Sequence, residues 1–86
     1  MRMRDIFEIE EVDGKIYMVC LDSDVLAGMI ELNETAAYIV EKLMQETTTE
    51  EIAKQMCNEY ETTFEDALEG INVIVGQLKQ VNAIEE

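Results

Sequence analysis

The chain has 86 residues, of which 48% are hydrophobic, and its formal net charge at neutral pH is −14. This length suits one domain and is too short for two, so we expect residues 1–86 to form a single α+β domain with its own core. Nucleic acids and anionic membranes attract basic faces, so 20 acidic against 6 basic residues exclude both as partners.

The segment 6–21 is predicted to form a β-hairpin around Asp13 and Gly14. An Asp-Gly pair favours a two-residue type I′ turn, because both central residues need a positive φ. That turn pairs Val12 with Lys15 and, counting outward, places five side chains on one strongly apolar face: Phe7, Ile9, Ile16, Met18 and Cys20. The opposite face carries Glu8, Glu10, Tyr17 and Val19. We therefore expect helices to cover only the first face.

A loop over 22–27 is expected to lead into a third short strand, Met29 to Leu32. Asn33 follows at once, and its side chain can accept a hydrogen bond from the exposed N–H groups of a helix's first turn. The spacing of Ala36, Val40 and Leu43 then predicts an amphipathic helix from residue 34 to about residue 44.

Two further helices are predicted from threonine caps. Thr48 with Glu51 forms a capping box for a second helix, and Thr63 with Asp66 opens a third and longest one. The second helix is expected to bury Ile52, Met56 and Tyr60. The apolar stripe of the third comprises Ala67, Ile71, Ile74, Val75 and Leu78, and Asn82 is expected to end it in a left-handed conformation.

Strands followed by helices are typical of an α+β domain with the helices on one face of a small antiparallel sheet. The expected core contains Phe7, Ile9, Met18, Val40, Leu43, Ile52, Met56, Ile71 and Leu78. A three-stranded sheet is open, so its edge strands present unpaired backbone groups that can dock an extended peptide.

The sequence lacks the residue patterns that metal binding or catalysis would need. The chain has no histidine and no CxxC motif, so we expect no metal, no cofactor, no catalytic residues and no enzyme activity. Cys20 and Cys57 lie in separate predicted elements among apolar neighbours, which favours reduced thiols in a cytoplasmic protein. Neither a membrane-spanning run nor a signal-peptide pattern is present.

Ser23 lies between Asp22 and Asp24 and suggests one possible modification site. Acidic composition and a serine could indicate an acyl-carrier-like protein with a phosphopantetheine on Ser23. In such carriers the serine starts a helix, whereas here a hairpin precedes it and a strand follows. An EF-hand loop is also excluded, since Asn33 stands where the bidentate Glu belongs. A solvated turn is the better interpretation.

Three short motifs resemble one known family. They are Leu32-Asn33-Glu34-Thr35-Ala36, the T-x-E-E-I opening of 48–52, and the break Tyr60-Glu61-Thr62-Thr63 before the last helix. In this order and spacing they are similar to the PqqD-like proteins, also called RiPP recognition elements, over about residues 7–84. That resemblance implies a winged helix-turn-helix-like domain whose third strand and third helix form a groove, where a leader peptide adds as an extra strand.

The resemblance also implies a function in natural-product biosynthesis. The chain would be a non-catalytic, chaperone-like module that captures the leader of a ribosomally made precursor peptide. It would present that leader to a modifying enzyme, first of all a radical SAM maturase and otherwise a leader peptidase system. The alternative is a winged-helix regulatory or protein-interaction domain. The acidic charge either keeps the domain soluble or favours a basic partner surface.

By the same resemblance the peptide pairs with the strand Met29, Ile30, Glu31 and Leu32. The groove wall is expected on the third helix, beside the Ile71–Leu78 stripe, at Leu68, Asn72, Val75 and Lys79. An apolar Leu68 off the stripe centre indicates either a ligand-facing position or a wider core contact. Lys79 could pair with a carboxylate of the leader.

Overall fold

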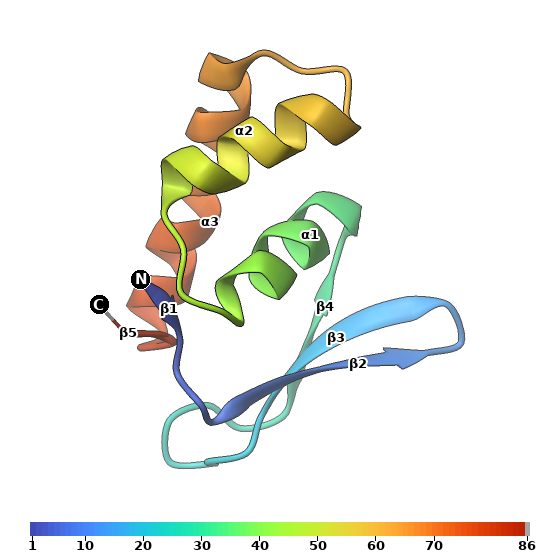
Figure 1. Cartoon of the computed structure of the whole chain (residues 1–86). Helices are drawn as coiled ribbons and strands as arrows, with labels where there is room; N and C mark the ends of the chain where they lie inside the picture. Colours follow the sequence, from blue (N-terminus) through green and yellow to red (C-terminus); the bar gives the residue numbers. More distant parts are fainter. Residues whose placement is uncertain (86) are drawn as a thin grey trace.

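The computed structural model describes residues 1–85 and confirms an α+β architecture with three helices on one side of a small sheet (Figure 1). The main sheet is antiparallel, in the order β2-β3-β4, and a second pair joins β1 to β5. The elements are β1 (Arg2–Met3), β2 (Phe7–Val12), β3 (Lys15–Cys20), β4 (Met29–Leu32), α1 (Glu34–Leu43), α2 (Thr49–Glu59), α3 (Phe64–Gln80) and β5 (Ile84–Glu85).

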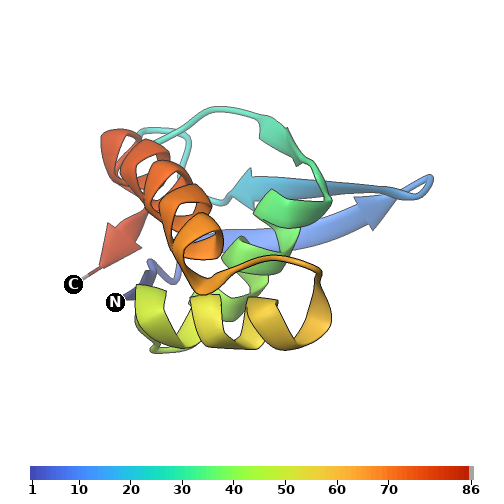
Figure 2. The same ribbon diagram turned by 90° about the horizontal axis from the view of Figure 1, so that it is seen from above.

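The hairpin of β2 and β3 has the predicted turn and register. Asp13 and Gly14 both have positive φ, 54° and 80°, and Val12 pairs with Lys15 as a two-residue loop requires. The pairing continues through Ile9 with Met18 to Phe7 with Cys20. Its tip projects beyond the helices in both views (Figures 1 and 2). The apolar face of the hairpin thus lies toward the helices, while Glu8 and Glu10 are exposed.

Side-chain caps begin all three helices, as the sequence predicts. The Asn33 side chain accepts a hydrogen bond from the Ala36 N–H at 2.8 Å, which turns the end of β4 directly into α1. Thr48 accepts from Glu51 at the start of α2, and Thr63 accepts from Asp66 at the start of α3. The abrupt change from β4 to α1 fixes where the strand ends relative to the helices.

The prediction for Tyr60 was wrong. Tyr60 is the C-cap of α2, with an extended backbone, and its side chain is 36% exposed instead of buried. The spacing from Ile52 through Met56 points to residue 60 only if the helix continues, and α2 ends at Glu59. The ring is therefore carried past the helix end and lies against Tyr38 of α1.

The core lies between the sheet and the helices. Every residue predicted for it is buried except Ile9, which is half-buried at the core's edge. The chain ends also contribute to the core, which no sequence pattern indicated: Met3 is 1% exposed, and Ala83 is fully buried. Asn82, with φ of 62°, ends α3 as expected and lets β5 return to pair with β1.

Candidate functional site

The outer edge of β4 is open, because β4 pairs with β3 alone in the described part of the chain. The register shows which backbone groups face outward. A two-residue turn makes Val12 and Lys15 a hydrogen-bonded pair, and bonding direction alternates along an antiparallel strand, so Ile16 and Met18 bond toward β4. Their partners are Leu32 and Ile30.

The backbone N–H and C=O groups of Met29 and Glu31 consequently point to the free edge. Hydrogen-bonding groups two residues apart on an exposed edge are the template that an extended peptide uses to add as a strand. Met29 is exposed, and none of the four residues of β4 is buried. Of the four strand residues predicted from the sequence, Met29 and Glu31 therefore offer free backbone groups at this edge, and Ile30 and Leu32 bond to β3.

A hollow of about 240 Å³ lies beside this edge, between β4 and α3. Its floor includes the buried side chains of Met18 and Val40, and Asn33 and Gln77 give it polar groups. The other residues that line it are Ile30, Glu31, Leu32, Ala36, Ile74, Leu78 and Val81. Alternate side chains of a strand point to the same face, so every second residue of an added strand would face this mostly apolar hollow.

The four helix residues predicted for the groove wall do not line this hollow. Leu68 and Asn72 border a different, open depression on α3 together with Glu65, Glu69 and Val73. Val75 is 5% exposed and belongs to the core, and Lys79 is exposed. The hollow instead lies on the other flank of the Ile71–Leu78 stripe, where α3 presents Ile74, Gln77 and Val81.

The sequence alone did not show which flank of α3 lies beside β4. Ile74 was assigned to the core stripe, yet in the structure it is half-buried and lines the hollow. A helical apolar stripe has two flanks at 100° per residue, and only the position of β4 decides which flank faces the sheet edge. Gln77 and Val81 gave no separate indication.

The described residues offer little for other kinds of site. Among residues 1–85 no group of histidine, cysteine or acidic side chains could hold a metal ion. The thiols of Cys20 and Cys57 are free. Ser23 is exposed in a turn in which the Asp24 N–H donates to the Asp22 side chain, with β3 before it and β4 after it. No helix in this part of the chain is long and apolar enough to cross a membrane.

Comparisons with known proteins bear on the family and the fold. The family model described as coenzyme PQQ synthesis protein D (PqqD) matches residues 17–84. The fold is similar to that of TbiB1 in complex with the TbiA(beta) leader peptide, with a TM-score of 0.81 and 18% identity over 99% of this chain and 95% of that chain. Lasso peptide synthetase B1 complexed with the leader peptide gives a TM-score of 0.75 and 28% identity, over 92% and 89%. No curated protein matches the sequence.

Proposed function

Because the chain belongs to the PqqD family, we propose that it is a leader-peptide-binding module for a ribosomally made precursor peptide. It captures the leader and presents it to a modifying enzyme, without catalysing a step itself. The observation that carries the proposal is the open edge of β4 beside an apolar hollow. The two similar solved proteins, each with a leader peptide bound, support it.

In this proposal the leader adds as a fourth strand to the main sheet. Its backbone exchanges hydrogen bonds with Met29 and Glu31, and these bonds hold any extended sequence in place. Selectivity comes from alternate apolar side chains of the leader that enter the hollow against Ile30, Ile74 and Val81. The proposed site thus comprises the strand Met29–Leu32 and the α3 flank of Ile74, Gln77 and Val81, in place of the flank expected from the sequence.

The proposal also names the class of enzyme that receives the leader. The family resemblance favours a radical SAM maturase, and we propose that residues 1–86 act as one domain that hands the leader to it. A charge of −14 makes duplex DNA a poor ligand, which disfavours a DNA-binding regulator of winged-helix type.

Calorimetric titration with the synthetic leader of a candidate precursor peptide tests the proposal, using a matched pair of α3 variants. Ile74→Ala is expected to weaken leader binding about 15- to 50-fold, because about two to three methylene groups, at about 0.8 kcal/mol each, lose their contact with the peptide. Leu68→Ala removes a similar volume from the opposite flank and is expected to leave the affinity within about twofold.

Both variants should first be checked for an unchanged fold by circular dichroism. The absence of leader binding by the wild-type protein would refute the proposed function. Equal losses in the two variants, or a larger loss in Leu68→Ala, would refute the groove wall assigned to Ile74.

A further inference from the structure

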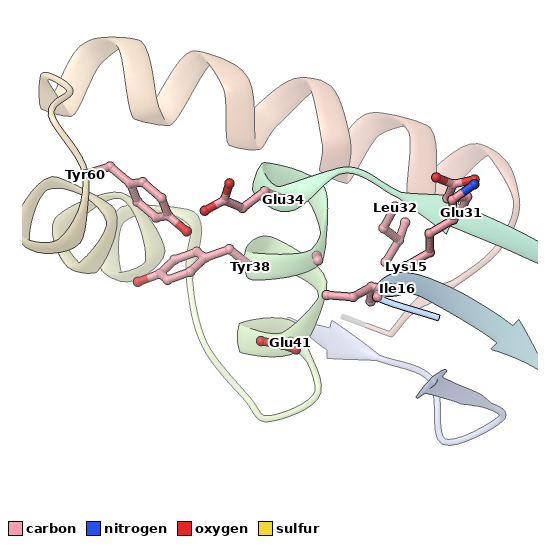
Figure 3. Close-up of a pocket in the computed structure, with 10 residues that line it drawn as sticks. Lys15, Ile16, Glu31, Leu32, Glu34, Tyr38, Glu41 and Tyr60 are labelled. Carbon is pink, nitrogen blue, oxygen red and sulfur yellow. The ribbon is translucent and has the colours of Figure 1, made fainter. Parts of the chain in front are cut away.

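A second and larger hollow, of about 400 Å³, lies between the turn end of the hairpin, the end of β4 and α1 (Figure 3). It is lined by Gly14, Lys15, Ile16, Glu31, Leu32, Glu34, Ala37, Tyr38, Glu41 and Tyr60. Only Glu31 and Leu32 also line the hollow beside α3. Eight of the ten lining residues of this second hollow therefore lie outside the hollow proposed for the leader.

Two tyrosine rings form one end of it. Tyr38 and Tyr60 meet edge to face, with 5.4 Å between ring centroids and 85° between ring planes. The Tyr38 hydroxyl donates a hydrogen bond to the Glu59 carboxylate, which holds the ring of Tyr38 in place. The Tyr60 side chain is partly exposed and is not part of the buried face of α2. The result is a rigid aromatic corner that faces solvent.

Carboxylates surround this corner. Glu34 lies at the same end of the hollow as the two rings, whereas Lys15 lies at the other end (Figure 3). Burial raises the pKa of Tyr60, and the charges of Glu34, Glu59 and Glu41 raise it further. Burial, the hydrogen bond to Glu59 and the charge of that carboxylate raise the pKa of Tyr38 to about 12. Carboxylates therefore lie close to both rings.

The corner also attracts a cation within the chain itself. The Lys42 ammonium lies 5.1 Å from the centroid of the Tyr38 ring, within the range of a cation–π contact. This contact involves Tyr38, and the structure has no corresponding cation–π contact for Tyr60 among residues 1–85. An aromatic corner with negative charge around it favours a cation that can also stack on a ring, and arginine combines both properties.

We propose that this hollow binds an arginine side chain of a basic segment on the modifying enzyme, a contact separate from the leader site. The guanidinium would stack on the ring of Tyr60 and form ion pairs with the Glu34 and Glu41 carboxylates. This inference rests on the proposed function, since a module that presents a leader needs a second surface for the enzyme. The net charge of −14 would speed the encounter with such a basic surface.

The test is a titration of ¹⁵N-labelled protein with N-acetyl-arginine amide, followed by amide shifts. We expect saturable shifts at Glu34, Tyr38, Glu41 and Tyr60 that persist when the leader is bound. N-acetyl-citrulline amide has nearly the same shape without the charge, so it should cause no such shifts. The double variant E34Q/E41Q should weaken arginine amide binding at least fivefold and should weaken capture by the cognate modifying enzyme to a similar degree.

A matched variant separates local binding from general attraction to an acidic protein. Replacing Glu8 and Glu10 on the exposed face of β2 with glutamine (E8Q/E10Q) changes the net charge by the same amount and should leave arginine amide binding unchanged. Equal losses in the two double variants, equal shifts with citrulline amide, or unchanged enzyme capture by E34Q/E41Q would overturn the proposal. Leader affinity is measured separately and should not change in E34Q/E41Q, so failure of the leader site is recognised independently.

Discussion

Replacing Leu43 with alanine is expected to lower the free energy of unfolding by about 2–5 kcal/mol. The Leu43 side chain is fully buried at the end of α1 and belongs to the central apolar cluster with Phe7, Ile52 and Ile71. Its removal leaves a cavity that the surrounding helices and sheet can only partly fill. In a domain of this size, that loss is a large share of the total stability.

Denaturant unfolding monitored by circular dichroism measures this effect, with Val73→Ala as the matched control. Val73 lies on α3 and is 56% exposed, so its truncation should change the free energy by no more than about 0.5 kcal/mol. If the unfolding midpoints of the two variants move equally, the assignment of Leu43 to the core is wrong.

Replacing Glu31 with proline is expected to weaken leader binding about 100-fold while the domain stays folded. The Glu31 N–H points to the free edge of β4, so proline removes a donor that the sheet itself does not use. Proline is tolerated on an edge strand when its nitrogen faces solvent. Its ring also occupies the space that the backbone of an added strand needs.

Two other substitutions make this prediction specific. Glu31→Gln removes the same charge but keeps the N–H, so it should bind the leader within about threefold of the wild-type affinity. Ile30→Pro removes a donor that bonds to β3 and should destabilise the sheet. Calorimetry and circular dichroism of the three variants separate these cases. Similar affinities for the proline and glutamine variants at position 31 would exclude strand addition at this edge.

The local parts of the fold were predictable from the sequence because short-range signals encode them. Asp13 and Gly14 can form few turns other than the one that sets the register of β2 and β3, and Asn33 marks the start of α1 within one residue. The pairing of β1 with β5 had no such signal. Each strand has two residues, which is too short for a periodic pattern, and they come from opposite ends of the chain.

Only the strand of the candidate site was predictable, because it follows from the order of the elements along the chain. The exposed strand Met29–Leu32 follows from the element sequence, whereas the choice between the flanks of Leu68 and Ile74 depends on how α3 crosses the sheet. Tyr60 illustrates the same limit: its spacing fits α2, but the end of the helix moves it into the second hollow. Long-range packing decides both positions.

Mapping backbone amide shifts of ¹⁵N-labelled protein during titration with the cognate leader tests leader binding at β4 most directly. We expect the largest shifts at Met29–Leu32 and at Ile74, Gln77 and Val81, because these residues line the free edge or the hollow beside it. Shifts confined to α2 and the Asp13-Gly14 turn, with β4 and this flank of α3 unchanged, would contradict leader binding at this site.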